Sequence, residues 1–257
     1  MKTVYIGMQK SKTILVTGAT SGVGLLIAKK LAKKGYNVIA TGRNKNVLTE
    51  LAKSNMMIIK SDLSTMEGVR NLVKQLPPLD VAIFSAGIGT FEYATEIEDE
   101  DLLAMLHVNI QAPMILTKHI AKKMKKQNHG QLIYIGSQAG KVATPKASVY
   151  AATKHAIIGY TNALRMELAS NHIIVTCIHP GPIDTPFIDH ADQTASYRTA
   201  MKHVLLDAEK VAEAAIKTIG KNTREVNLPQ YMGVSSKLYA IAPSIVEKLG
   251  KRFFNKK

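Results

Sequence analysis

The sequence predicts an α/β fold in which one doubly wound parallel sheet of about seven strands carries helices on both faces. Short apolar runs alternate with helical patterns along nearly the whole chain of 257 residues. These runs are apolar almost throughout, as expected for a parallel sheet that is covered on both sides. Repeated β-α-β units with right-handed crossovers build such a sheet.

The predicted elements alternate from residue 13 onward. Apolar runs predict strands at 13–18, 36–42, 56–62, 79–87, 130–137, 172–181 and 224–229. Helical patterns between them predict helices at 22–34, 47–54, 66–75 and 99–127, around Tyr150, and at 208–219. Because no repeat or low-complexity linker interrupts this order, we expect three parts: an N-terminal extension at 1–12, one domain at 13–235 and a basic amphipathic tail at 236–257.

Composition narrows the class of protein. Hydrophobic residues make up 46% of the chain and charged residues 21%, which is typical of a soluble globular protein. The single cysteine, Cys177, cannot form an intrachain disulfide, and the N-terminus lacks the apolar core of a signal peptide. No apolar run approaches the length of a membrane span. We therefore expect a cytoplasmic protein.

The net charge of +15 is compatible with nucleic acid, an anionic membrane or an anionic ligand as partner. Two lysine clusters, at 29–34 and 122–126, end predicted helices, where cations suit the helix dipole. No aromatic residues interleave with these lysines, so no nucleic-acid partner is expected. The eight histidines show no HExxH motif and no paired Cys/His spacing, so no metal site is expected.

A glycine-rich turn follows the first predicted strand. The segment TGATSGVG (17–24) places Gly18, Gly22 and Gly24 before the first helix, where a doubly wound fold binds a dinucleotide. Glycines let the pyrophosphate approach the backbone, and the helix N-terminus supplies free N–H groups. The spacing is G-x-x-x-G-x-G. The alternative is an ordinary strand-to-helix turn, which seldom needs three glycines.

The end of the second predicted strand bears on the choice of dinucleotide. NAD enzymes usually place an acidic residue there to bind the ribose 2′-hydroxyl, whereas this chain has Thr41, Gly42, Arg43 and Asn44. A 2′-phosphate would gain from the Arg43 guanidinium. The sequence therefore favours NADP(H). The alternative is that Arg43 is a plain surface residue.

Five motifs, in their order, resemble the short-chain dehydrogenase/reductase family, whose members have a Rossmann-type sheet. They are the glycine-rich turn, Asn109, Ser137, Tyr150-x-x-x-Lys154 and HPGPIDT (179–185), and they span roughly 13–230. The branch looks like NADP-preferring bacterial reductases similar to the D-alanine-transfer-operon dehydrogenase. The resemblance implies an NADP(H) site formed by Gly18, Thr20, Ser21, Gly22, Val23, Gly24, Arg43, Asn44, Asp62, Leu63, Ala86, Gly87, Asn109, Tyr150, Lys154, Pro180, Gly181, Ile183 and Thr185.

Two positions depart from the family pattern. The family usually has Asn-Ala-Gly after the fourth strand, where this chain has Ser85, Ala86 and Gly87. Because serine can still hydrogen-bond, we expect a small loss of rigidity there and no loss of function. The usual basic residue before the second glycine is replaced by Ser21, so Arg43 would carry most of the preference for a 2′-phosphate.

Tyr150 and Lys154 are the candidates for proton transfer. Residues i and i+4 of a helix share one face, so the phenol and the ammonium can point into one site. A nearby ammonium and a positive nicotinamide ring would lower the tyrosine pKa from its usual value of about 10. An exposed lysine stem lying over a tyrosine ring is the competing interpretation. The resemblance implies that Lys154 also binds the nicotinamide ribose, that Ser137 holds the substrate oxygen and that Asn109 positions a water in a proton relay.

These residues favour NADP(H)-dependent reduction of a small-molecule carbonyl, or oxidation of a secondary alcohol, with Tyr150 as general acid/base. One alternative is a catalytically quiet NADP(H)-binding regulator, although that class has usually lost the tyrosine or the lysine. Another is a nucleic-acid-binding protein driven by charge, for which no binding motif is present. The expected substrate pocket is largely apolar and lined by Val142, Ile183, Phe187, Ile188, Tyr197 and Met201.

A homodimer or homotetramer is expected, because the predicted helix at 99–127 and the helix around Tyr150 carry more apolar residues than one face of the sheet can bury. Family members commonly dimerise through this helix pair, which makes a two-fold symmetric contact. The apolar positions that exceed the needs of one sheet face are Leu102, Met105, Leu106, Met114, Ile120, Met124, Ile157, Ile158, Tyr160 and Leu164.

The tail from 242 to 257 combines an apolar stripe with basic residues. The stripe at helical spacing consists of Ile245, Val246, Leu249 and Phe253. Glu247 alone opposes the basic residues Lys248, Lys251, Arg252, Lys256 and Lys257. The pattern predicts either a helix on an anionic membrane surface, which would make the protein peripheral there, or a helix docked on the protein's own body or a partner subunit. Gly250 weakens an isolated helix and so favours docking slightly.

Overall fold

The computed structural model describes residues 11–192 and 194–254, with side chains to residue 249, and contains the seven-stranded parallel sheet that the sequence predicts. The strand order is β3-β2-β1-β4-β5-β6-β7, and each pair of neighbours runs parallel. The chain therefore begins at the middle of the sheet, winds out to β3, crosses back to β4 and continues to β7. Ligands of such folds bind at this switch point, outside the carboxyl ends of the strands.

The elements follow the predicted order. The strands are β1 (Thr13–Thr17), β2 (Asn37–Gly42), β3 (Met57–Lys60), β4 (Val81–Phe84), β5 (Gly130–Ile135), β6 (Ile173–Pro180) and β7 (Glu225–Leu228). The helices that cover the sheet are α1 (Gly22–Lys33), α2 (Lys45–Ala52), α3 (Met66–Gln75), α4 (Asp99–Leu106), α5 (Ala112–Gln127), α6 (Ser148–Glu167) and α9 (Ala208–Lys217). None of the described helices is both long enough and apolar enough to cross a membrane.

Helices that the sequence analysis did not assign lie in the last third of the chain. They are α7 (Pro186–Ala191), α8 (Ser196–Met201) and α10 (Gln230–Ile241), while α11 (Pro243–Phe254) coincides with the predicted tail. The expected boundary between 235 and 236 falls inside α10. The expected extension at 1–12 lies outside the described residues except for its last two.

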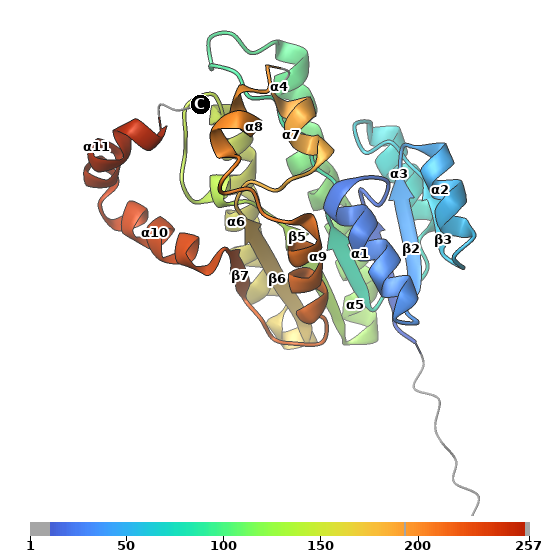
Figure 1. Cartoon of the computed structure of the whole chain (residues 1–257). Coiled ribbons are helices and arrows are strands. Elements are labelled where there is room, and N and C mark those ends of the chain that lie inside the picture. Colours follow the sequence, from blue (N-terminus) through green and yellow to red (C-terminus); the bar gives the residue numbers. More distant parts are fainter. Residues whose placement is uncertain (1–10, 193, 255–257) are drawn as a thin grey trace, which may run out of the picture.

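The core consists of two apolar layers, one on each face of the sheet, and Figure 1 shows the helices on both sides. Leu15 of β1 points to the layer that α3, α5 and α6 complete. Its neighbours Ile14 and Val16 point to the opposite layer, with α1, α2 and α9. Because successive strand residues face opposite sides, a strand that is buried on both faces must be apolar throughout. This explains the unbroken apolar runs of the sequence.

The helix expected at 99–127 is not a single α-helix. A π-helical turn, η1 (His107–Gln111), separates α4 from α5. Asn109 lies in this turn and is 3% exposed. π-turns insert an extra residue into a helix and occur frequently at functional sites. The wider turn therefore marks the place where this helix contributes to the site.

Half of the residues expected in a dimer contact are buried within one chain. The prediction that these apolar residues are left over for a partner was therefore wrong. The buried residues are Met105, Ile120, Met124, Ile157 and Leu164. Leu106 remains exposed, and so does its unpredicted neighbour Leu103. A homodimer or homotetramer stays a prediction, and these two leucines of α4 are the side chains that support it.

Candidate active site

Two residues of α6 lie at the carboxyl end of the sheet. Tyr150 is 9% exposed and Lys154 is 6% exposed. The Lys154 Nζ lies 5.6 Å from the centre of the Tyr150 ring. The pair is therefore real, but it is buried, and the interpretation as an exposed lysine stem over a tyrosine ring was wrong.

Ser137 follows β5 and meets Tyr150. Its Oγ accepts a hydrogen bond of 3.0 Å from the amide of Ala139, at the start of the short helix η2 (Gln138–Gly140). The Ser137 side chain also hydrogen-bonds the Tyr150 hydroxyl. The end of a strand and the face of a helix thus bring two hydroxyl groups together, where both can contact one substrate oxygen.

Burial decides the pKa of the Tyr150 phenol. Loss of solvent raises this pKa to about 12, and the hydrogen bond with Ser137 opposes the rise. The expected lowering by Lys154 is not seen here, because burial also lowers the pKa of the Lys154 ammonium, to about 8. Both effects have one cause, since a site of low dielectric disfavours either charged form. At neutral pH the phenol is protonated and can donate a proton.

Asn109 braces the segment after β4. Its Oδ1 accepts from the amide of Ile88 at 2.9 Å, and its Nδ2 donates to the carbonyl of Ile88 at 2.8 Å. The same Nδ2 donates to the Thr153 hydroxyl of α6 at 3.1 Å. A Cβ at Gly87 would lie 3.4 Å from Asn109 Oδ1 and 3.6 Å from Lys154 Nζ, so these two polar groups face the same stretch of backbone. The side chain of Asn109 therefore holds the loop in place beside Lys154. Its part in a water relay stays a prediction.

The turn between β1 and α1 has the shape that a pyrophosphate requires. Gly18 has φ +67°, and a Cβ there would lie 2.8 Å from the Cα of Ala86. A Cβ at Gly24 would overlap the carbonyl of Gly18. The N-cap residue of α1, Ser21, makes no capping hydrogen bond with its side chain, and the first turn, which includes Val23, has no acidic residue. The helix N-terminus can therefore donate to an anion.

The ends of β2 and β3 form the side on which an adenosine would lie. A Cβ at Gly42 would come within 2.6 Å of Thr20, so the glycine-rich turn packs directly on the end of β2. Arg43 is exposed, and Asn44 caps α2 by accepting from the amide of Val47 at 3.2 Å. Burial tends to raise the pKa of Asp62, but hydrogen bonds from Ser64 and the charge of Arg43 lower it overall. Arg43 thus lies near Asp62. Leu63, which follows Asp62 in the chain, is buried.

The segment after β6 covers the glycine-rich turn from the other side. The amide of Gly181 donates to the carbonyl of Leu228 at 2.7 Å, which fixes the Pro180–Gly181 step against β7. Ile183 forms an isolated bridge with Leu206. A Cβ at Gly22 would lie 3.6 Å from the Thr185 side chain. The residues expected to bind a cofactor therefore surround one cradle, and the cradle's shape and donors fit a dinucleotide.

Residues 12–196 match the family described as short chain dehydrogenase. The chain belongs to this family of oxidoreductases. It is 31% identical to an uncharacterized oxidoreductase, YxnA, of Bacillus subtilis, over 96% of this chain and 72% of that protein. It is 35% identical to a 3-oxoacyl-(acyl-carrier-protein) reductase of Rickettsia felis, over 71% of this chain and 77% of the relative.

The solved structures place this short-chain dehydrogenase in the same fold. The closed form of a serine dehydrogenase in complex with NADP+ superposes with a TM-score of 0.77 and 30% sequence identity. The match covers 83% of this chain and 94% of the other. Membership in the NADP-preferring branch that the sequence resembles stays a prediction.

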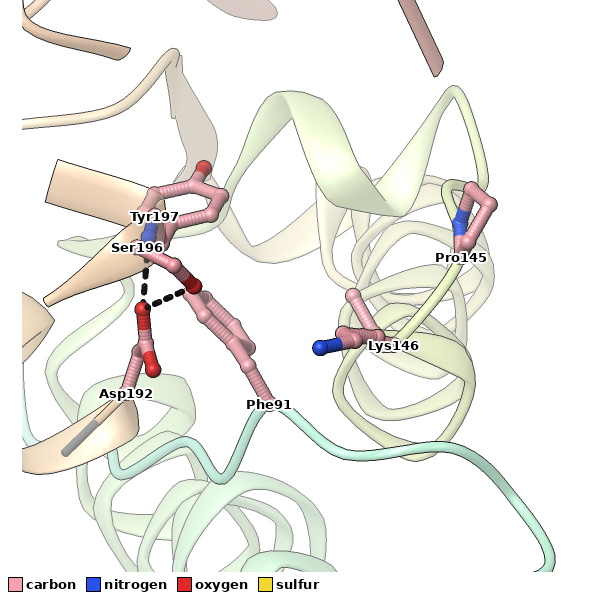
Figure 2. A pocket seen from close by; sticks show the side chains of 7 residues that line it. Phe91, Pro145, Lys146, Asp192, Ser196 and Tyr197 are labelled. Atoms are coloured by element: carbon pink, nitrogen blue, oxygen red, sulfur yellow. Dashed lines mark hydrogen bonds between the residues drawn. The ribbon is translucent and has the colours of Figure 1, made fainter. Parts of the chain in front are cut away.

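Aromatic side chains surround Tyr150 in this short-chain dehydrogenase, and Figure 2 shows two aromatic side chains of this region, Phe91 and Tyr197, at a pocket. The ring of Tyr150 lies 5.7 Å from that of Phe91 and 5.6 Å from that of Phe187, measured between centres. Phe91 in turn lies 4.7 Å from Tyr197 of α8. Asp192 holds α8 in position by accepting from the amide of Tyr197 at 2.6 Å. The surroundings of the Tyr150 ring are therefore aromatic, and their use as a substrate entrance stays a prediction.

A pocket beside these aromatic residues differs from the substrate pocket that the sequence predicts. Of the six predicted residues, Tyr197 lines it. Ile188 and Met201 are each 3% exposed and belong to the packing of α7 and α8. This pocket is lined by Phe91, Pro145, Lys146, Ala147, Asp192, Ser196 and Tyr197. The sequence carried no signal for Lys146, because this residue belongs to an irregular segment that only the fold brings to the pocket.

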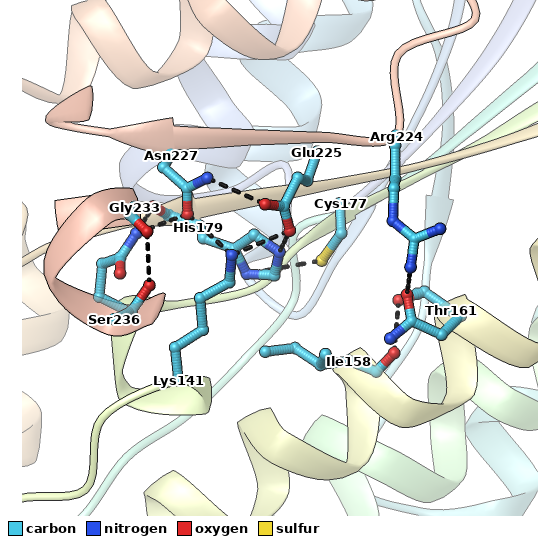
Figure 3. A network of polar contacts seen from close by, with 12 residues as sticks. Lys141, Ile158, Thr161, Cys177, His179, Arg224, Glu225, Asn227, Gly233 and Ser236 are labelled. Carbon is cyan, nitrogen blue, oxygen red and sulfur yellow. Dashed lines mark hydrogen bonds and ion pairs between the residues drawn. The ribbon is translucent and has the colours of Figure 1, made fainter. Parts of the chain in front are cut away.

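A partly buried polar network around His179 and Glu225 was not predicted (Figure 3). The Lys141 ammonium donates to Glu225 and to Asn227, each at 2.9 Å. The His179 ring lies 3.5 Å from the Glu225 carboxylate. Gln138 donates to the carbonyl of His179 at 2.8 Å. The network therefore fixes the segment that follows Ser137 against β6 and β7.

We expect His179 to make the folded protein sensitive to acid. Burial, followed by the charge of Lys141, lowers the pKa of His179 to about 4 from 6.5. Above pH 6.5 the ring is neutral in both states and has no effect. As the pH falls from 6.5 to 4, the unfolded chain binds a proton that the folded chain does not, so stability is lost. The loss should reach about 3 kcal/mol.

Urea unfolding at pH 7 and at pH 4.5 measures this loss for wild type and for His179→Gln. The variant should lose less stability than the wild type between the two pH values. The difference between the two losses isolates His179, because all other titrating groups are the same in both proteins. Equal losses in the two proteins would show that His179 does not cause the effect.

Proposed function

We propose that this short-chain dehydrogenase reduces a carbonyl compound with NADPH, or oxidises a secondary alcohol with NADP+, and that Tyr150 transfers the proton. The observation that carries the proposal is the buried Tyr150, hydrogen-bonded to Ser137 and one helical turn from Lys154, beside a glycine cradle. An acid, an oxygen-binding hydroxyl and a dinucleotide site are the parts that such a reaction needs.

The chain's own residues would act on the substrate oxygen. When bound, the nicotinamide supplies or accepts the hydride. The hydroxyls of Ser137 and Tyr150 donate hydrogen bonds to the carbonyl oxygen and so place its carbon for attack. As negative charge develops on that oxygen, Tyr150 gives it the phenolic proton. Lys154, whose Nζ lies 5.6 Å from the ring, stabilises the phenolate that remains.

Arg43 is the basis for proposing NADP(H) over NAD(H). The end of β2 has no carboxylate for a ribose 2′-hydroxyl, and it has an exposed guanidinium near Asp62. A guanidinium binds a phosphate through charge-assisted, often paired hydrogen bonds. The serine dehydrogenase relative, which is in complex with NADP+, supports the same choice.

The aromatic side chains around Tyr150 favour a carbonyl that is attached to an apolar group. The rings of Phe91 and Phe187 lie against the Tyr150 ring, and the ring of Tyr197 lies against Phe91, so the surroundings of Tyr150 are aromatic. The 3-oxoacyl reductase relative acts on a ketone, by its name. A quiet NADP(H)-binding regulator is disfavoured, because Ser137, Tyr150 and Lys154 are all in place.

Oxidation of NADPH, followed by its absorbance, over a panel of ketones, aldehydes and 3-oxoacyl thioesters tests the proposal. We expect turnover of at least one carbonyl with an apolar substituent. NADPH binding should be measured separately by fluorescence. Tight binding without turnover of any compound would favour the regulator, and absence of binding would contradict both functions.

A further inference from the structure

Helix α10 exposes a continuous row of apolar side chains. The exposed fractions are 61% for Tyr231, 63% for Val234, 57% for Leu238 and 81% for Ile241. At 100° per residue, these four positions lie within a stripe about 80° wide. A row of this kind on a soluble protein marks a surface that a partner covers.

The side of α10 that faces the body is the opposite side. Gly233 and Ser236 are the buried residues of this helix. A Cβ at Gly233 would lie 2.9 Å from the Asn227 amide of β7, and Met232 packs in the same way on Gly181. Apart from Met232, the helix therefore places small and polar residues against the protein and its other large apolar residues in solvent, which reverses the usual arrangement of a surface helix.

Helix α11 also exposes apolar side chains. Ile245 is 62% exposed and Leu249 is 82% exposed. The Tyr239 hydroxyl of α10 donates to Glu247 of α11 at 2.9 Å, which links the two helices. Figure 1 shows both helices extending from the body beyond β7. Docking of α11 on the chain's own body, one of the two expectations for the tail, is contradicted for these two side chains. The predicted Phe253 and the basic residues after Gly250 lie outside the described side chains.

We propose that the apolar row of α10 and α11 (Tyr231, Val234, Leu238, Ile241, Ile245 and Leu249) docks on an anionic membrane surface. Residues 230–257 contain six basic residues and one acidic residue, Glu247, which gives a net charge of +5. Anionic headgroups attract such a segment while the apolar row enters the acyl boundary. A tyrosine suits this boundary, because its ring is apolar and its hydroxyl is polar.

Charge also argues against a second copy as the occupant. A two-fold contact would place the same surface on both partners. It would therefore bring one segment of charge +5 against another, and like charges disfavour association. An anionic lipid surface supplies the opposite charge. The proposal does not depend on the enzymatic function proposed above.

Co-sedimentation of the full chain with vesicles tests the proposal. Vesicles of phosphatidylcholine with an equal part of phosphatidylglycerol should bind the wild type, whereas pure phosphatidylcholine should bind it at least about tenfold less. Ile241→Glu removes an apolar side chain from the row and adds a negative charge. It should weaken binding to the anionic vesicles by roughly tenfold or more.

The matched control is Met166→Glu on α6, because Met166 is 77% exposed and Ile241 is 81% exposed. The control variant should bind vesicles as the wild type does. No binding by the wild type, or equal binding by Ile241→Glu, would overturn the proposal. Light scattering is measured in parallel. If Ile241→Glu dissociates an oligomer and no form binds vesicles, the row belongs to a contact between copies of the chain, and the membrane proposal is wrong.

Discussion

Replacement of Tyr150 by phenylalanine is expected to lower turnover by at least about 100-fold on any substrate that the wild type accepts. The ring stays, so its contacts with Phe91 and Phe187 are preserved. The Tyr150 hydroxyl, which is both the proton donor and the partner of Ser137, is lost. The substrate oxygen must then take its proton from water, which the aromatic side chains keep away. Steady-state NADPH oxidation measures the loss.

A matched change on the same helix is Tyr160→Phe. Tyr160 is partly buried, and its hydroxyl donates to the carbonyl of Met114, on the side of the core. This variant should keep its turnover within about threefold, because it removes one hydrogen bond that is far from the reacting oxygen. Equal NADPH affinity in both variants, measured by fluorescence, shows that the cradle is intact. If Tyr150→Phe turned over like the wild type, another residue would have to be the acid.

Replacement of Arg43 by aspartate should invert the choice of cofactor. The guanidinium that would bind the 2′-phosphate is lost, and a carboxylate that repels the phosphate and can accept from a 2′-hydroxyl takes its place. The dissociation constant for NADPH should rise at least about tenfold, since hydrogen bonds to charged groups are worth roughly 1.5–3 kcal/mol. Affinity for NADH should increase.

Two further variants separate position from charge. Arg43→Lys keeps the charge but loses the paired donors, so NADPH affinity should fall less than with aspartate. Lys118→Asp on the exposed side of α5 changes the net charge by the same amount as Arg43→Asp. It should leave both dissociation constants unchanged. A loss of NADPH affinity with Lys118→Asp that matched the loss with Arg43→Asp would mean that the overall field of the basic protein determines the preference.

Features that depend on short stretches of chain could be predicted from the sequence. The order of strands and helices follows from apolar runs and helical periods, and all seven strands were found. The glycine-rich turn was recognisable because a backbone that passes this close to its neighbours admits no side chain at Gly18 and Gly24. The Tyr150–Lys154 pair was recognisable because four residues make about one helical turn. Each of these signals is contained within a few residues.

Features that depend on which surfaces meet could be decided only by the tertiary structure. Phe91 and Tyr197 are distant in the chain, yet their rings pack 4.7 Å apart, and Phe91 also contacts the Tyr150 ring. The predicted dimer residue Met105 is buried, whereas Ile241 of an unassigned helix is exposed. The pKa of Tyr150 rises because packing removes its water, although the lysine one turn away is visible in the sequence. Periodicity shows which side of a helix is apolar, but burial and desolvation depend on every element that packs against that side.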